Sequence, residues 1–115
     1  MTMYKKGDVV IIKFPFADAA EYKKRPALII SNKVVNDTDD YLMVQITSKD
    51  KKDTLSFTLN TNDFLNNKEL PLKSYVRIHK IFLLNKNLII SKATAITPEC
   101  IKNISEKIIE LIKEE

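Results

Sequence analysis

Short β-branched apolar segments separated by polar turns fill residues 8–96, and this pattern limits the fold more than any other feature of the chain. β-branched and aromatic residues favour strands, and the segments that predict strands are 8–14, 27–31, 41–47, 55–59, 74–84 and 88–96. The run at 27–31 is apolar almost throughout, which is typical of a strand buried on both faces. The chain has one glycine, so asparagine, aspartate and lysine must form most of the turns.

The segments between these strands are short and polar. Residues 32–40 and 48–53 are expected to be loops, residues 61–65 a capped helical turn, and residues 85–87 a hairpin loop. No internal repeat or low-complexity segment interrupts the order. We therefore expect a single domain over residues 1–115, with an antiparallel sheet.

A helix is predicted after the last strand. Thr97 offers a capping hydroxyl, Pro98 suits the first helical position, and Glu99 places an acid in the first turn. Five apolar residues follow at helical spacing and are expected on one packed face: Ile101, Ile104, Ile108, Leu111 and Ile112. Strands followed by one packing helix predict a mainly β fold with a C-terminal helix.

The composition excludes several classes of site. One glycine cannot build a phosphate-binding loop, and His79 with Cys100 cannot build a Cys/His zinc site. The acidic turn at 37–40 lacks the glycine and final glutamate of a calcium loop, and we interpret it as solvated. The sequence therefore predicts no metal and no cofactor.

The sequence also bears on where the protein acts. No apolar run approaches the ~18 residues that span a bilayer, and the first residues lack the order of a signal peptide. A single cysteine, Cys100, allows no internal disulfide. We expect a cytoplasmic protein with no membrane partner.

The charge is unevenly distributed along the chain. Residues 1–92 carry 16 basic and 10 acidic side chains, a net of +6, whereas residues 93–115 carry 3 basic and 5 acidic ones, a net of −2. A basic body favours an anionic partner such as RNA or DNA. Ordinary solubilising charge explains a value of this size equally well.

Four segments resemble, in order and spacing, the MazF/PemK family of toxins. They are 6–10 with 14–16 (KGDVV, FPF), 24–31 (KRPALIIS), 46–48 (ITS) and the weaker 72–77 (LKSYVR), followed by the C-terminal helix. Together they span residues 6 to about 112. Two departures stand out: residues 17–24 and 91–94 lack glycines that are common in the family.

The resemblance implies an SH3-like barrel (MazF/PemK/CcdB-like), a homodimer, and a toxin that inhibits growth and is neutralised by a cognate antitoxin. It also implies a metal-independent, sequence-selective endoribonuclease that cuts single-stranded RNA. The family's paired arginine and threonine correspond to Arg25 and Thr47, and Ser48 belongs to the same motif.

The residue chemistry agrees with such a reaction. RNA carries its own nucleophile, the 2′-hydroxyl, so the enzyme must stabilise charge on the phosphoryl oxygens and move two protons. The planar guanidinium of Arg25 matches two phosphate oxygens, and the hydroxyls of Thr47 and Ser48 can bond phosphate or leaving oxygen. Hydroxyls are poor bases, which leaves Glu21, Asp18 and His79 as candidates for the general base. For Glu21 and His79, a solvated surface side chain is the competing interpretation.

Lysines flank both halves of the motif, and we expect them to bind RNA if the two loops lie side by side. They are Lys23, Lys24, Lys49, Lys51 and Lys52. A solvated lysine-rich surface is the competing interpretation. Two other functions stay open: a gyrase-binding toxin of the same fold, which needs neither Arg25 nor Thr47, and a non-catalytic nucleic-acid-binding barrel.

Overall fold

The structure is a computed structural model that describes residues 3–14 and 23–115. Its strands are β1 Asp8–Phe14, β2 Lys23–Ile29, β3 Asp40–Thr47, β4 Ser56–Leu59, β5 Ser74–Asn85 and β6 Ile89–Ala95. Its helices are α1 Lys33–Asn36 and α2 Pro98–Glu110, and single 3₁₀ turns occur at η1 Thr61–Asp63, η2 Leu65–Asn67 and η3 Lys86–Leu88. The predicted mainly β fold with a C-terminal helix is confirmed.

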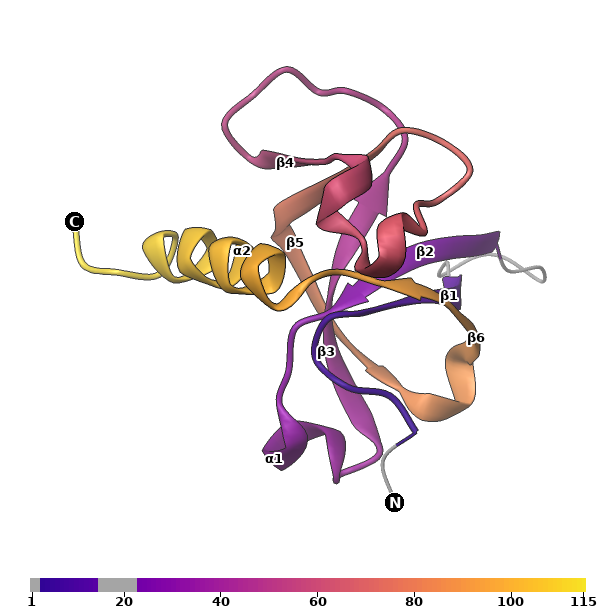
Figure 1. Cartoon of the computed structure of the whole chain (residues 1–115). Coiled ribbons are helices and arrows are strands. Elements are labelled where there is room, and N and C mark those ends of the chain that lie inside the picture. The colour runs from indigo at the N-terminus through magenta and orange to yellow at the C-terminus, as the bar shows by residue number, and fades with distance from the viewer. Residues whose placement is uncertain (1–2, 15–22) are drawn as a thin grey trace.

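The strands form one six-stranded sheet in the order β4-β5-β3-β2-β1-β6 (Figure 1). All five neighbouring pairs are antiparallel, as expected. A bridge between Phe64, which follows η1 at the β4 edge, and Ile96, just after β6, joins the two edges of the sheet. The sheet is therefore curled, and its edges meet at that point instead of remaining open.

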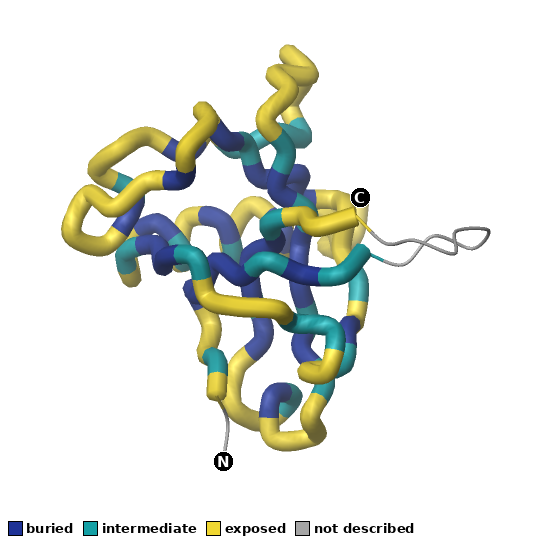
Figure 2. Tube along the Cα trace, turned by 90° about the vertical axis from the view of Figure 1, so that its right-hand side faces the viewer, coloured by how far each residue is buried: buried dark blue, intermediate teal, exposed yellow. Residues whose placement is uncertain are grey.

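The curled sheet has two apolar cores, one on each face. Val9, Leu28, Val44 and Val76 belong to the core that α2 completes. Alternate residues of the same strands, such as Val10, Ile29 and Met43, form the second core with Tyr41 and Leu84. Because neighbouring strand residues point to opposite faces, the first part of β1, the last three residues of β2 and the middle of β3 are buried on both sides. Figure 2 shows such buried stretches in dark blue inside the molecule.

The one glycine, Gly7, occupies the turn that leads into β1. Its φ of +96° lies where residues with a Cβ are strained. Its N–H donates to the Ile29 carbonyl at 2.8 Å, and its carbonyl accepts from the Ile96 N–H at 2.9 Å. Gly7 thus ties the start of β1 to the ends of β2 and β6.

Helix α2 begins as predicted but ends earlier. Thr97 Oγ1 accepts a hydrogen bond from the Cys100 N–H at 3.1 Å, so the expected cap is present. Ile104 and Ile108 are buried and Ile101 is half-buried. The prediction that Leu111 and Ile112 share this face is wrong: both follow the helix and are 44% and 78% exposed. Both lie past the end of α2, where the chain leaves much of their apolar surface in solvent.

Smaller differences concern the loops and strand ends. Residues 32–40 include a helix, α1, because Asn32 caps it by accepting from the Val34 N–H. β2 spans Lys23–Ile29, whereas the sequence predicted a strand over 27–31. The strand therefore starts four residues earlier and ends two residues earlier than predicted. β5 contains a large bulge: Val44 pairs with Ile81, but the next residue, Gln45, pairs with Arg77. Residues 78–80 are therefore extra residues opposite β3.

Candidate functional site

The strand registers place a set of polar residues on one face of the sheet. Ile12 pairs with Arg25, and Ala27 pairs with Gln45. Gln45 in turn pairs with Arg77. Directly paired residues of antiparallel strands lie on the same face, and so do residues two apart on one strand. Arg25, Gln45, Thr47 and Arg77 therefore share the face of the second core, at the end where it opens to solvent.

A hollow of about 460 Å³ occupies this end of the face, and we call it the main hollow. Its apolar wall consists of Ile12, Phe14, Pro26 and Phe82. Its polar lining consists of Arg25, Gln45, Thr47, Lys49, Lys51, Arg77, His79 and Lys80. The size falls within the range of ligand-binding clefts, and six basic or imidazole side chains with no acid in the lining favour an anionic ligand.

A second hollow of about 290 Å³, the side hollow, opens on the other face of the same strand ends. Arg25, Pro26, Thr47 and Lys49 line both hollows. The remaining lining of the side hollow is Ile11, Lys24, Ile46, Ser48, Leu70, Pro71, Leu72 and Ser74. Arg25 and Thr47 thus stand on the ridge between two depressions, where an extended ligand can contact both.

Arg25 and Thr47 both have polar groups that a ligand can contact. Arg25 is exposed, and within residues 3–14 and 23–115 its guanidinium has no hydrogen bond or ion pair. The Thr47 hydroxyl accepts from the Lys49 N–H at 3.1 Å, which leaves its own hydrogen available to a ligand. The arrangement offers a charged fork and a hydroxyl donor at one place.

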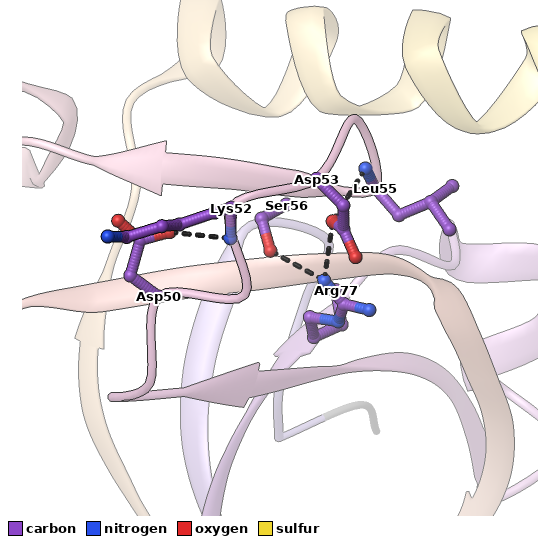
Figure 3. A network of polar contacts seen from close by, with 6 residues as sticks. All are labelled: Asp50, Lys52, Asp53, Leu55, Ser56 and Arg77. Atoms are coloured by element: carbon purple, nitrogen blue, oxygen red, sulfur yellow. Dashed lines mark hydrogen bonds and ion pairs between the residues drawn. The ribbon is translucent and has the colours of Figure 1, made fainter.

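Arg77 contrasts with Arg25, because it is held inside the wall of the main hollow. Its side chain is 9% exposed, and Nη1 donates to Asp53 Oδ1 at 2.8 Å and to Ser56 Oγ at 2.7 Å (Figure 3). The hydrogen bond from Arg77 is the largest of the effects that hold the pKa of Asp53 below its ordinary value. The carboxylate therefore stays charged and keeps the guanidinium in place.

The same contacts anchor the loop between β3 and β4. Asp53 Oδ1 also accepts from the Leu55 N–H at 3.0 Å, and the Leu55 carbonyl accepts from the Ile78 N–H at 3.0 Å. Asp50 accepts from the Lys52 N–H at 2.9 Å in a similar turn (Figure 3). The loop that carries Lys49 and Lys51 is thus fastened to the bulge of β5.

Two absences among the described residues bear on the kind of site. Within residues 3–14 and 23–115, no cluster of three His, Cys, Asp or Glu side chains could hold a metal ion. No helix of that part of the chain is long and apolar enough to cross a membrane. Burial raises the pKa of the Cys100 thiol to about 12, so the only cysteine is an inert core residue.

A family model decides what kind of protein has this site. It describes a "PemK-like, MazF-like toxin of type II toxin-antitoxin system" and matches residues 5–112. The chain belongs to this toxin family. The resemblance noted in the sequence is therefore confirmed over nearly the whole chain. The comparison with curated proteins found no match.

Solved structures share the fold of this MazF-like chain at low identity. An endoribonuclease from Mycobacterial species is 22% identical with a TM-score of 0.74, over 96% of this chain and 91% of that one. MazF from Deinococcus radiodurans is 20% identical with a TM-score of 0.75, over 95% and 96%. A Mycobacterial endoribonuclease in complex with its cognate antitoxin is 22% identical with a TM-score of 0.71, over 96% and 99%. At such identities the likeness establishes the fold.

The structure brings some of the residues predicted for the site together and separates others. Arg25, Thr47 and Lys49 meet at the ridge, and Lys51 joins them in the main hollow. Lys24 and Ser48 line only the side hollow. Lys23 and Lys52 are exposed and line neither hollow. Glu21 and Asp18 lie outside the described residues, so among the candidate bases only His79 is placed, and it lines the main hollow.

Sequence reasoning missed Arg77, Gln45 and Asp53 as parts of the site. The sequence places Arg77 only within the predicted strand 74–84, and Asp53 only within the predicted loop 48–53. The available signal was an arginine within a strand whose inward neighbours are apolar, because a buried arginine requires an acidic partner. That signal does not reveal which of the many acids is the partner.

Proposed function

We propose that this MazF-like toxin is a metal-independent endoribonuclease that cuts single-stranded RNA in the cytoplasm. One observation carries the proposal: Arg25 and Thr47 lie together on the ridge between two hollows, and the exposed guanidinium has no partner among the described residues. The family membership and the endoribonucleases among the structures of the same fold support it. Lys49 and Lys51 supply further positive charge where an RNA backbone would lie.

In the proposed reaction the 2′-oxygen of one ribose forms a bond to the adjacent phosphorus, and the bond from phosphorus to the 5′-oxygen breaks. The 2′-hydroxyl loses a proton to a base, and the 5′-oxygen gains one. Arg25 stabilises the charge that accumulates on the two non-bridging oxygens, and the Thr47 hydroxyl donates to one of the phosphate oxygens. The products are a 2′,3′-cyclic phosphate and a 5′-hydroxyl.

His79 is the side chain of the main hollow best suited to proton transfer, because an imidazole ring can both accept and donate a proton. Glu21 remains a second candidate for the base. Replacing each with glutamine separates them: the base is the residue whose loss removes the rise of the cleavage rate with pH.

The decisive experiment is incubation of the purified protein with single-stranded RNA in EDTA. We expect cleavage to continue, with 5′-hydroxyl ends that polynucleotide kinase labels without prior dephosphorylation. Ends that carry 5′-phosphate, or activity abolished by EDTA, would refute the mechanism. Intact RNA would favour the gyrase-binding or the non-catalytic alternatives.

We further propose a homodimer neutralised by a cognate antitoxin with an acidic, amphipathic segment. Leu72 is 66% exposed beside Lys24 and Lys49 in the side hollow, so that groove offers both apolar and basic contacts. A small domain also gains stability from a twofold partner. Light scattering tests the dimer, and a mass near 13.3 kDa would exclude it.

A further inference from the structure

The main hollow contains a second guanidinium, that of Arg77. Unlike a typical phosphate-binding guanidinium, it already has an ion pair within the protein. Arg77 is buried and neutralised by Asp53, whereas the other cations of the hollow, Arg25, Lys49, Lys51 and Lys80, have no ion pair within the described residues. An ion pair reduces the attraction of a guanidinium for a further negative charge. It leaves the N–H groups as directional donors.

The donors that remain on Arg77 form one edge of the guanidinium. The hydrogen bonds to Asp53 and Ser56 both use Nη1, and no described residue accepts from Nη2 or Nε. These two groups form a rigid fork that matches a pair of neighbouring acceptors. Because Asp53 and Ser56 fix Nη1, the orientation of the fork is set before a ligand arrives (Figure 3).

The walls near this fork suit a flat aromatic ligand. Phe14 and Phe82 line the same hollow and meet edge to face, with ring centroids 5.7 Å apart. Both rings are half-buried. Unstacked RNA bases are commonly held on aromatic side chains and read along their edges. Gln45, paired with Arg77 across the strands, adds an amide at the same place.

We propose that the main hollow binds one guanine base of the RNA substrate and that Arg77 is the residue that selects it. Guanine presents two adjacent acceptors, O6 and N7, which is the pattern an arginine fork contacts most often. Adenine replaces O6 with an amino donor, which would face the donors of Arg77. The inference rests on the proposed function, because it assigns one base position in the substrate of that same site.

The test measures binding rather than cleavage, so that it remains informative if RNA is not cut. The probes are fluorescent 2′-O-methyl oligouridines that carry one central guanine, adenine, cytosine or 7-deazaguanine, and the readout is anisotropy. The 2′-O-methyl group blocks the nucleophile, and 7-deazaguanine removes only the N7 acceptor. We expect the guanine probe to bind roughly 5- to 140-fold more tightly than the adenine probe, the range of one bidentate contact.

Two variants at position 77 test whether the guanidinium of Arg77 causes the preference for guanine. Arg77→Leu should bind the guanine and 7-deazaguanine probes equally, and Arg77→Lys, which keeps the charge, should retain only part of the preference. Arg25→Ala is the matched control, because it removes the other arginine: its overall affinity should fall while the ratio between probes persists. Circular dichroism checks that each variant is folded.

Three results would overturn the assignment. They are equal binding of all probes by the parent protein, a guanine preference that survives in folded Arg77→Leu, and a preference for cytosine over guanine. Each leaves the proposed cleavage activity untouched, since the EDTA assay measures that separately. Conversely, a protein that shows the guanine preference without cutting RNA would retain this inference and lose the proposed reaction.

Discussion

The only two arginines of the chain line the same hollow in opposite physical states. Arg25 is exposed at the start of a strand, and no described residue pairs with it. Arg77 is buried mid-strand and held by two hydrogen bonds from one nitrogen. An unpaired guanidinium keeps its full attraction for phosphate, whereas a paired one contributes geometry. Identical side chains therefore take different roles because of their surroundings.

Removing Arg25 should have the largest effect on activity. Arg25→Ala is expected to lower the cleavage rate by about 10² or more, the loss typical of one group that stabilises transition-state charge. The melting temperature should hardly change, because the exposed side chain supports little of either core. Arg25→Lys should restore only part of the rate, since it lacks the fork. If the Arg25→Ala protein cuts RNA as fast as the parent, Arg25 does not stabilise the transition state.

Thr47 offers the next test, because it shares the ridge with Arg25 but is uncharged. Thr47→Val should slow cleavage roughly tenfold, the equivalent of one neutral hydrogen bond. Thr47→Ser keeps the hydroxyl and should remain close to the parent rate. If the serine and valine variants are equally slow, the methyl packing of Thr47 matters and its hydroxyl does not.

A third test compares lysines that line the main hollow with lysines that line neither hollow, by their effect on RNA binding. Lys49→Ser and Lys51→Ser should each weaken RNA binding and reduce the slope of log affinity against log salt by about 0.7, the value for one contact to a single strand. Lys52→Ser, in the same loop, and Lys23→Ser, at the start of β2, are the controls, because neither lysine lines a hollow. Equal effects in all four variants would show that only the overall charge counts.

The smallest expected effect is a pH dependence of stability at Asp53. Arg77 lowers the pKa of this carboxyl below its ordinary value of 3.8, so the native state favours the ionised form. The resulting stabilisation is present above pH 3.8 and is lost as the pH falls through the lowered native pKa. Asp53→Asn should lack this loss.

The measurement is urea unfolding of the parent and of Asp53→Asn between pH 2 and 6. The difference in unfolding free energy should be constant above about pH 4 and shrink in stronger acid. A difference that grows as the pH falls would mean that Arg77 does not stabilise the charged carboxylate.

The sequence by itself determined the strands, the start of the last helix and the family. These features depend on local rules: β-branched runs between polar turns, a Thr-Pro-Glu cap, and short motifs in a fixed order. Local patterns also placed Arg25 at the start of a strand and Thr47 at the end of another. Whether the two would meet depended on register, which no single segment reveals.

Only the tertiary structure decided how the hollow is built. The bulge in β5 changes which residues face β3, and it pairs Arg77 with Gln45. The ion pair of Arg77 joins residues 24 positions apart, and sequence offered many acids as its partner. The same holds for Leu111 and Ile112, whose helical spacing predicted burial although both lie past the end of α2 and are exposed. Spacing defines a face of a helix, but only the packed neighbours determine whether that face is covered.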